Sequence, residues 1–583
     1  MKAVSWLDPS ELRIGLGCMR LPPDEQLARD TILAAASAGV TIFDTAHAYG
    51  ADRAGLGHNE RLVAGALRVA GWHESSRIVT KGGMTRPGGA WVPDGRAKAI
   101  AADCEASLAA LDGLPIDMYL IHAPDPRTRW RTSVRALARL VDQGMVRRVG
   151  LANVTRTQLD EALELAPIAA VQVALSPLND QALRGGLLAR CTELGLTLIA
   201  HSPLGGPRRA AALARRRELA EIAARHNATA AEAALAWLLS LSPHLVAIPG
   251  ARRPDSARSA ARAAELALDD DEQTALTVAF GGARRAVRDV SVGAPANVRA
   301  RGEVVMVMGI PGAGKTRLAA GYVQRGYRRL NRDDRGGSLR ALAGELDQQL
   351  AAGARRAVLD NTYLTRAARS RVVETAERHS LAVRCVWLDT PLAQAQVNLV
   401  ERLLERFGSL PTPEQVRDAA RREPWLMLPA SQMRAVRELE RPSIDEGFAA
   451  VETVPFARVS AGGGGRGVFV GAATTTRQGI AEALAEGDPS APHLVFDWAP
   501  DGDCSALRTN LARIASTITG PVEVAVCPHP GGPPTCWCRP PLPGLPLAFA
   551  HAHSIDPTQS ILVGCSPTHR TLAATLGARY LPV

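Results

Sequence analysis

The stretch VMVMGIPGAGKTRLAAGYV, residues 305–323, decides the fold of the middle of this chain. Apolar residues lead into a glycine-rich turn, Lys315 and Thr316 follow it, and a helical pattern comes next. A strand, the pattern G-x-x-x-x-G-K-S/T and a helix, in that order, form the phosphate-binding loop of nucleotide-binding α/β domains. The sequence therefore predicts an ATP site at residues 309–316.

The residues of this loop have separate expected roles. Gly309, Gly312 and Gly314 let backbone N–H groups face the phosphates. Lys315 reaches the outer phosphates, and the hydroxyl of Thr316 can ligate the Mg²⁺ that accompanies ATP. The loop alone does not identify the group that accepts the phosphate.

Lysine is scarce in the rest of the chain. Of 68 basic residues only four are lysines, namely Lys2, Lys81, Lys98 and Lys315. Because arginine supplies nearly all the positive charge, a retained lysine indicates chemistry that a guanidinium cannot perform. Lys81 and Lys315 are the two candidates.

Length and composition set the outer bounds. A chain of 583 residues is too long for one domain and suggests three or four. Its 46% hydrophobic and 22% charged residues are ordinary for a globular protein. There is no signal-peptide pattern and no apolar run of about 18 residues, so we expect a cytoplasmic protein without a membrane partner. The nine cysteines do not form a disulfide framework of the kind found in small secreted domains.

Short apolar runs alternate with helical patterns in the first 280 residues. Eight strands with helical spacers over about 260 residues are typical of a parallel (β/α)₈ TIM barrel, which we predict for residues 1–280. The eight runs are LRIGLG, GVTIFDT, RIVTKGG, IDMYLIHA, MVRRVGLAN, AAVQVALS, GLTLIAHS and HLVAIPGA.

Two further α/β segments follow the barrel. Residues 281–301 are polar and rich in Gly and Pro, which predicts a linker. Residues 302–459 alternate strands and helices around the phosphate loop and predict an α/β sandwich, 460–467 predict a second linker, and 468–583 predict a third α/β domain. The expected fold class is therefore α/β throughout.

The barrel segment carries four residues that resemble a catalytic tetrad. FDTAHAYG contains Asp44 and Tyr49, VTKGG contains Lys81, and YLIHAPD contains His122. In this order and spacing the segment resembles an aldo/keto reductase over its whole length. Each of the three residues other than Tyr49 lies near the end of an apolar run, at the strand ends where barrel enzymes keep their chemistry.

The four side chains suit the reduction of a carbonyl group by hydride. A phenol with a pKa near 10 is a poor acid unless a neighbouring cation stabilises its phenolate. Tyr49 would then be the proton donor, Lys81 the cation, Asp44 the group that orients it, and His122 the group that aligns the carbonyl.

The resemblance also implies a nicotinamide cofactor site. It assigns Asn153, Gln172 and Ser202 to cofactor binding, and Arg252 and Arg253 could pair with a 2′-phosphate, which favours NADPH. The chain departs from the family at two positions: His201 stands where a tyrosine often stacks on the nicotinamide, and Ala260 where an asparagine is usual. These departures predict an altered grip on the cofactor.

Two stretches after the phosphate loop narrow the choice of acceptor. GYRRLNRDDRGG and AVLDNTYLTRAARSR, taken with the loop, resemble the 5′-kinase domain of polynucleotide kinases over residues 303–458. By this resemblance Asp333 accepts the proton of a 5′-hydroxyl and Asp360 contacts the acceptor. A helix cap is the other interpretation of Asp333. The resemblance also implies an arginine that steadies the leaving phosphates. Its register falls on Gln396 and Glu401, and Arg402 and Arg406 lie nearby in the sequence.

The last segment contains a compact set of metal ligands. Cys527, His529, Cys536 and Cys538 have the spacing C-x-H-x₆-C-x-C. With SILVGC further on, the segment resembles haloacid dehalogenase (HAD) phosphatases of the zinc-bearing histidinol-phosphatase type. Three thiolates and an imidazole make a closed, structural Zn²⁺ site. A chance cluster on a loop is the alternative.

The phosphatase motifs themselves are degenerate. By the resemblance, two aspartates belong at Gly471 and Ala473, a Thr or Ser at Asp497, and metal-binding aspartates at Cys565 and His569. Because no carboxylate stands at 471 to form a phospho-aspartate, we predict an inactive phosphatase.

Together these segments predict an enzyme that processes nucleic-acid ends, with RNA favoured over DNA. Residues 301–460 hold 25 Lys+Arg against 19 Asp+Glu, a surplus that suits a phosphate-rich partner or simply a solvated basic face. Two alternatives stay open. One is a metabolic reductase joined to a small-molecule kinase, and the other is a kinase whose barrel and tail are non-catalytic scaffolds.

Overall fold

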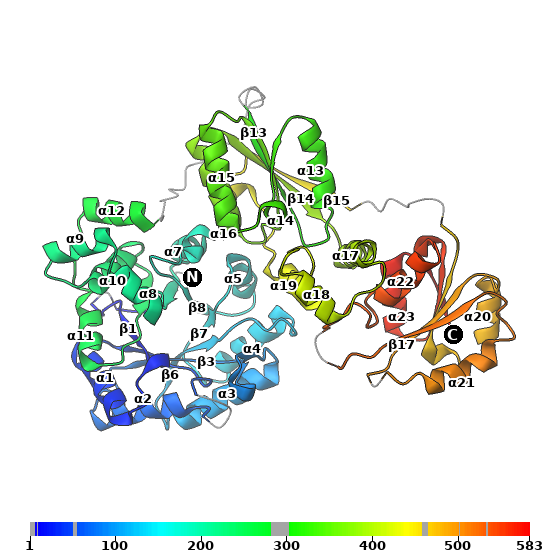
Figure 1. Cartoon of the computed structure of the whole chain (residues 1–583). Helices are drawn as coiled ribbons and strands as arrows, with labels where there is room; N and C mark the ends of the chain where they lie inside the picture. The colour runs from blue at the N-terminus through cyan, green and yellow to red at the C-terminus, as the bar shows by residue number, and fades with distance from the viewer. Residues whose placement is uncertain are drawn as a thin grey trace. The chain divides into compact units, whose positions relative to one another are not determined.

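The computed structural model describes residues 6–583 except 9, 51–54, 281–301, 457–463, 501 and 532–533. The chain forms two compact units, residues 1–290 and 291–583 (Figure 1). The predicted linker at 281–301 and the first half of the predicted linker at 460–467 lie outside the described residues.

Eight parallel strands close into a barrel in the first unit. They pair in chain order, and a parallel bridge between Ile14 and Ala247 closes the ring between the first and last strands. The predicted (β/α)₈ barrel is thus confirmed. The strands are β1 (Gly15–Gly17), β2 (Ile42–Asp44), β3 (Arg77–Gly82), β6 (Ile116–Ile121), β7 (Val149–Ala152), β8 (Ile168–Ala174), β9 (Thr197–His201) and β10 (Leu245–Ile248).

The barrel helices form because their apolar residues recur at helical spacing and their ends are capped. The helix Trp130–Asp142, for example, buries Val134, Leu137 and Leu140 on a single face. Thr155 and Thr229 each begin a helix with a capping box. A short hairpin, β4 (Met84–Thr85) and β5 (Val92–Pro93), follows β3. The helices are α1 (Glu25–Ser37), α2 (His58–Val69), α3 (Ala97–Ala110), α4 (Trp130–Asp142), α5 (Arg156–Leu163), α6 (Gln181–Arg184), α7 (Leu187–Leu194), α8 (Pro207–Leu213), α9 (Arg217–Arg225), α10 (Ala230–Ser240), α11 (Pro254–Arg262) and α12 (Asp270–Phe280).

The second unit begins with a five-stranded parallel sheet in the order β12-β13-β11-β14-β15. Its central strand, β11, is an apolar run because neighbouring strands and helices cover it, and the phosphate loop leaves its carboxyl end. The strands are β11 (Glu303–Met308), β12 (Arg328–Leu330), β13 (Arg356–Asp360), β14 (Ala382–Asp389) and β15 (Ala450–Pro455). The helices are α13 (Lys315–Gln324), α14 (Arg332–Arg335), α15 (Leu339–Ala351), α16 (Arg366–Arg378), α17 (Leu392–Phe407), α18 (Pro413–Ala419) and α19 (Pro429–Glu438).

A second parallel sheet, in the order β18-β17-β16-β19-β20, completes this unit. This strand order reverses between β16 and β19, as in doubly wound α/β folds, and such a reversal is where these folds place ligands. The strands are β16 (Val468–Gly471), β17 (His493–Trp498), β18 (Val522–Cys527), β19 (Ile561–Gly564) and β20 (Arg579–Pro582). The helices are α20 (Ile480–Glu486), α21 (Ser505–Ile514), α22 (Gly544–Ala552) and α23 (Pro567–Leu576).

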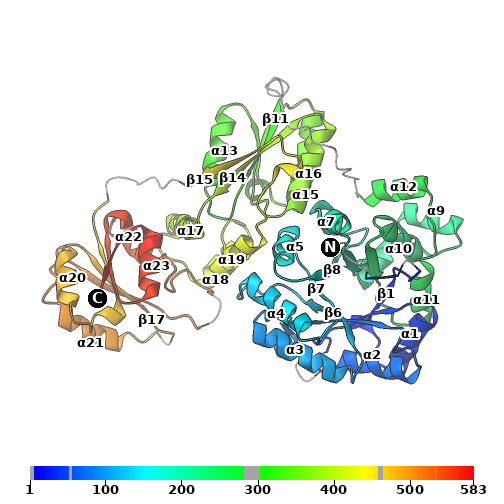
Figure 2. The same cartoon turned by 180° about the vertical axis from the view of Figure 1, so that it is seen from behind.

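The two sheets of the second unit share a hydrophobic core. Leu403 and Leu404 of α17 belong to the same buried cluster as Trp537 and Leu547 of the C-terminal segment. Both views show α17 beside α22 and α23 (Figures 1 and 2). The side chain of Gln394 also donates a hydrogen bond to a backbone carbonyl of α23, at 3.2 Å. The sequence predicts the two α/β segments as successive domains, and the structure packs them into one unit.

The described end of the second predicted linker is fixed to the C-terminal sheet. The N–H of Gly465 donates to the carbonyl of Ser554 at 2.9 Å, and its own carbonyl accepts from the N–H of Asp556 at 2.9 Å. Residues 464–467 therefore belong to the C-terminal segment.

Among the residues that the structure describes, none of the helices combines the length and the apolar character needed to cross a bilayer.

One buried ion pair joins α16 to the segment before β15. The guanidinium of Arg369 is fully buried and donates two hydrogen bonds to the Glu446 carboxylate, both at 2.7 Å. It also donates to the backbone carbonyls of Tyr363 and Glu440, both at 2.9 Å. The charge on Glu446 is therefore compensated inside the protein.

We expect Arg369→Met to lower the free energy of unfolding of the second unit by about 3–5 kcal/mol, because it leaves Glu446 buried without its partner. Arg421→Met is the matched control, since Arg421 and Asp418 form an exposed pair at 3.8 Å that contributes about 0–1 kcal/mol. Scanning calorimetry of the full chain measures both. Equal transition temperatures for the two variants would contradict the prediction.

Candidate functional sites

The four tetrad residues meet at the carboxyl ends of the barrel strands. Asp44 ends β2, Lys81 lies in β3, His122 directly follows β6, and Tyr49 lies in the loop after β2. The first three are buried. The structure thus brings together four residues that are separated by up to 78 positions in the sequence.

Lys81 is the centre of this group. Its ammonium donates to both Asp44 oxygens at 2.8 Å, to the Thr45 carbonyl at 2.7 Å and to the Tyr49 hydroxyl at 3.2 Å. Burial alone would lower the pKa of Lys81, but Asp44 and Tyr49 outweigh it, and the pKa is raised. The group is therefore a permanent cation next to the phenol.

The two neighbouring rings are held in their neutral forms. Burial raises the pKa of the Tyr49 phenol to about 12, although the Lys81 cation opposes this rise. Burial, with smaller contributions from Lys81 and His201, lowers the pKa of His122 to about 3. The rings meet edge to face with centroids 5.8 Å apart. The site therefore holds a protonated phenol beside a neutral imidazole.

Gln172 is hydrogen-bonded directly to one residue of the tetrad. Its side-chain amide donates to Asp44 Oδ2 at 2.6 Å, and the residue is buried. This donor is already engaged, although the resemblance assigns Gln172 to the cofactor.

The other residues assigned to the cofactor lie at neighbouring strand ends. Asn153 donates to the His122 carbonyl at 3.0 Å, and its amide oxygen lies 3.2 Å from His201 Nε2. His201 Nδ1 lies 3.2 Å from the Ser202 hydroxyl. Burial lowers the pKa of His201, so its ring is neutral. The side chains of Arg252 and Arg253 are exposed at the start of α11.

Sequence reasoning missed the aromatic lid of this site. Trp91, at the β4–β5 hairpin, has its ring centroid 6.3 Å from that of Tyr49 and 5.6 Å from that of His122. The Arg86 guanidinium stacks 3.9 Å from the Trp91 centroid. An isolated tryptophan in the glycine-rich stretch RPGGAWVP was the only available signal.

The phosphate loop adopts backbone angles that favour glycine. The φ angles of Gly309, Gly312 and Gly314 are 155°, 86° and 89°. A Cβ atom at Gly312 would lie 2.3 Å from the carbonyl oxygen of Ala395 on α17. Gly312 is therefore required both by its backbone angles and by the close approach of α17.

Lys315, the first residue of α13, lies over this loop, and no carboxylate of the residues that the structure describes forms an ion pair with it. Its ammonium donates to the carbonyls of Gly309 at 3.1 Å and Ile310 at 2.9 Å. Burial lowers the pKa of Lys315 to about 8, opposed by Asp360 and Asp333 and assisted by Arg402 and Arg332. An anion next to the ammonium would raise that pKa again.

Asp333 and Asp360, both predicted to act on the acceptor, line the same cavity but differ in exposure. Asn331, not Asp333, caps α14: its side-chain oxygen accepts the N–H of Asp333 at 2.6 Å. Asp333 is partly exposed and lines the cavity. Asp360 is buried, and both of its oxygens are bound by Arg329 at 2.9 and 2.8 Å. Of the two carboxylates, Asp333 is the one open to a ligand.

The four positions on α17 that were considered for contact with the leaving phosphates lie in different environments. Arg402 and Glu401 line the cavity, and the Arg402 guanidinium stacks 4.1 Å from the Trp425 centroid. Arg406 pairs with Glu423 at 2.9 Å, and Gln396 is buried. Arg402 is therefore the cation nearest to the phosphate loop among them.

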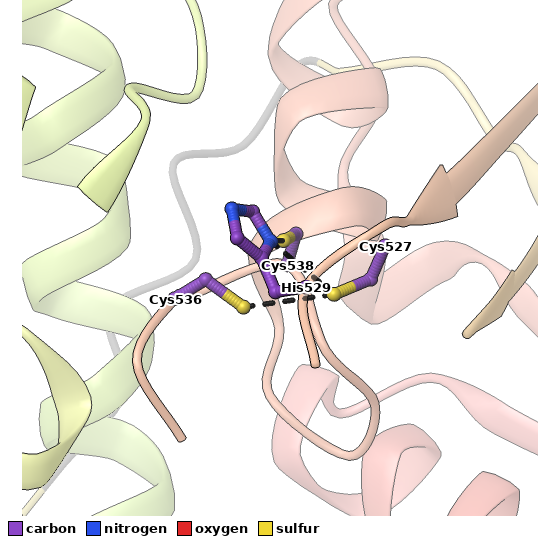
Figure 3. Close-up of side chains that lie close together, drawn as sticks. All are labelled: Cys527, His529, Cys536 and Cys538. Atoms are coloured by element: carbon purple, nitrogen blue, oxygen red, sulfur yellow. Dashed lines mark hydrogen bonds between the residues drawn. The ribbon is translucent and has the colours of Figure 1, made fainter. Parts of the chain in front are cut away.

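Four potential metal ligands, three cysteines and one histidine, converge in the C-terminal segment. Figure 3 shows Cys527 and His529, from the end of β18, facing Cys536 and Cys538. Their ligand atoms all lie within 4.8 Å of one another. Cys527 Sγ is 3.6 Å from both Cys536 Sγ and His529 Nδ1, and His529 Nδ1 is 3.2 Å from Cys538 Sγ. Sulfur atoms about 2.3 Å from one zinc ion, at tetrahedral corners, lie ~3.8 Å apart, so the arrangement fits.

A histidine fills the switch point of the second sheet. Gly471 ends β16 and Gly564 ends β19. A Cβ atom at Gly471 would lie 2.3 Å from His569 Cε1, and one at Gly564 would lie 2.5 Å from His569 Cβ. The His569 ring therefore occupies the place that any side chain at 471 would need.

Comparison with known proteins assigns the first unit. The model of the aldo/keto reductase family matches residues 13–279. An aldo-keto reductase of Strobilurus tenacellus is 30% identical over 275 residues, which are 42% of this chain and 78% of that protein. A probable aldo-keto reductase of Glycine max is 32% identical over 274 residues, 41% of this chain and 76% of that protein. The chain therefore belongs to the aldo/keto reductase family.

A second family model, described as an AAA domain, matches residues 304–423, around the phosphate loop. The chain thus joins an aldo/keto reductase-type barrel to a P-loop domain. Among solved structures, an aldo-keto reductase of Klebsiella pneumoniae in complex with NADPH is 26% identical and covers 47% of this chain and 92% of that one, with a TM-score of 0.41.

Proposed function

We propose that the barrel reduces a carbonyl substrate with NADPH and that the P-loop domain transfers phosphate from ATP to a 5′-hydroxyl end of a nucleic acid. The observation that supports this most is the pair of lysines at the two sites. Lys81 is buried and fixed beside a protonated phenol. Lys315 is half-buried over a phosphate loop, where no carboxylate of the described residues forms an ion pair with it.

In the reductase, this chain's residues supply the proton. NADPH, when bound, supplies a hydride to the carbonyl carbon. The carbonyl oxygen takes the Tyr49 proton, and Lys81 stabilises the phenolate that remains. The neutral His122 ring orients the carbonyl, and the Trp91 ring lies edge to face with both His122 and Tyr49 beside the place where the carbonyl would bind.

The cofactor fits, with a donor set that differs from the family pattern. Asn153, Ser202 and His201 would hold the nicotinamide side, together with Gln172, which also donates one amide N–H to Asp44. The exposed Arg252 and Arg253, at the N-terminus of α11, suit a 2′-phosphate.

In the P-loop domain, Asp333 would act as the general base. The hydroxyl proton of the acceptor moves to Asp333, the acceptor oxygen bonds to the γ-phosphorus, and the bond from that phosphorus to the β-phosphate oxygen breaks, releasing ADP. Lys315 and Arg402 would neutralise the phosphate charge. Thr316 lines the same cavity and would ligate the Mg²⁺ that screens the phosphates.

An RNA end is the acceptor we favour, and a small hydroxylated metabolite is the second candidate. The charges around the cavity are balanced, which favours either a small molecule or the entry of a chain end alone. The five basic residues are Lys315, Arg317, Arg325, Arg332 and Arg402, and the five acidic residues are Asp333, Asp360, Glu401, Glu405 and Asp556.

For the C-terminal segment we propose a HAD-like fold that has lost phosphatase activity and retains a structural zinc. Support comes from its doubly wound strand order and from His569, which fills the switch point where a nucleophile would stand. Cys527, His529, Cys536 and Cys538 would hold the zinc and order a proline-rich loop.

We expect Tyr49→Phe to lower carbonyl reduction by a factor on the order of 10² or more while NADPH still binds more tightly than NADH. Because the pKa of Tyr49 is raised to about 12, the wild-type rate should stay level through neutral and mildly alkaline pH. Fluorescence titration and NADPH oxidation with a panel of aldehydes measure these effects. If neither cofactor binds, the barrel is a scaffold.

We expect Lys315→Ala to abolish transfer of labelled γ-phosphate to a 5′-hydroxyl oligonucleotide, and Asp333→Asn to slow it on the order of 10²-fold or more. Asp334→Asn is the matched control on α14, because Asp334 pairs with Arg329 at 2.7 Å. Near-normal turnover in Asp333→Asn would show that the base assignment is wrong.

Metal analysis of the purified chain should find one zinc, and Cys536→Ser should lose it, whereas Cys504→Ser, outside the cluster, should keep it. Release of 3′-phosphate should be undetectable. A wild-type chain without zinc, or phosphate release that Cys565→Ala abolishes, would overturn the proposal.

A further inference from the structure

The cavity over the phosphate loop extends to the C-terminal segment. On one side it is lined by Lys315, Thr316 and Asp333, and on the other by α22 and the residues that follow it. Its volume is about 1520 Å³, whereas a pocket for one small ligand is about 300–1,000 Å³. The cavity therefore has room for a nucleotide and a second molecule.

The C-terminal wall is packed firmly against the P-loop domain. Trp537 lies between two of the proposed metal ligands, is buried, and donates its indole N–H to the Met427 carbonyl at 2.9 Å. A Cβ atom at Gly544, where α22 begins, would lie 2.4 Å from the Trp537 carbonyl and 3.1 Å from Leu410. At this point α22 is in direct contact with the loop that carries Trp537 and with Leu410 of the P-loop domain.

The same contact extends toward the phosphates. Met427 and Trp425 belong to one loop, and Trp425 carries the Arg402 guanidinium on its ring. Arg402, Trp425 and Met427 all line the cavity. The loop that carries Cys536, Trp537 and Cys538 therefore contacts both α22 and the loop of Trp425 and Met427. The Arg402 guanidinium stacks on this second loop.

The two ends of the cavity differ in chemistry. The cations Lys315, Arg332 and Arg402 line the cavity at the phosphate loop, and Arg402 and Arg332 add to the lowering of the pKa of Lys315. The opposite wall presents His551 and Ser554, both exposed in the cavity. An imidazole and a hydroxyl suit a sugar and an aromatic base, and the carboxylate of Asp556 on the same wall disfavours a phosphodiester there.

We propose that α22 and the segment after it form the acceptor side of the phosphotransfer site, and that His551 and Ser554 contact the terminal nucleoside. This inference rests on the proposed phosphotransfer at Lys315. It gives the C-terminal segment a binding role that its degenerate phosphatase motifs do not suggest.

The kinetic test uses full-length His551→Ala and Ser554→Ala with a 5′-hydroxyl ApA dinucleotide as acceptor. Each should raise the KM for ApA, His551→Ala by about tenfold, as for loss of a stacking contact, while the Kd for ATP is unchanged. His553→Ala is the control, because His553 pairs with Glu523 at 2.7 Å and does not line the cavity. Unchanged KM values in both test variants would overturn the inference, as would free ribose serving as well as ApA.

A second measurement does not need turnover. Hydrogen exchange of the full chain should show protection of residues 544–558 when ApA is added with a non-hydrolysable ATP analogue, and no protection there with the analogue alone. Absence of that protection would overturn the proposal that α22 and the segment after it bind the acceptor, even where phosphate transfer is observed. Protection without phosphate transfer would instead contradict the proposed function and leave the binding surface standing.

Discussion

An ammonium group that is taken partly or wholly out of water needs oxygen atoms around it, and both candidate sites are built on that requirement. Lys81 receives two carboxylate oxygens, a carbonyl and a phenol, so its charge is permanent and available to stabilise a phenolate. Among the described residues, Lys315 donates to two carbonyls, so its charge would be compensated further by an anion. In the proposed function, the same type of side chain would support acid catalysis in one unit and phosphate binding in the other.

Local sequence patterns predicted much of this molecule. Parallel strands that are buried on both faces appear in the sequence as short apolar runs, and for this reason all eight barrel strands could be predicted. The phosphate loop needs glycines at fixed places, and a metal cluster needs its ligands at short spacing. Each of these features is set by residues that are close together in the chain.

Contacts between distant segments could not be predicted in the same way. Gln172 binds Asp44 across 128 residues, and Arg329 occupies Asp360 across 31. The motifs of Gln172 and Asp360 suggest ligand contacts, yet tertiary packing gives each a protein partner. His569 likewise follows from the fold alone, because only the strand order of the second sheet places it against Gly471.

The scarcity of lysine allows one direct measurement of the central claim. With lysine labelled at ¹³Cε, NMR titration of the full chain has only four lysine signals to resolve. The Lys315 signal should titrate with a pKa of about 8 and move to a higher pKa when a non-hydrolysable ATP analogue is added, while the Lys81 signal stays that of a charged ammonium beyond pH 10. A Lys315 signal that titrates like a solvent-exposed lysine and does not respond to the nucleotide would contradict the claim that this half-buried charge binds a phosphate.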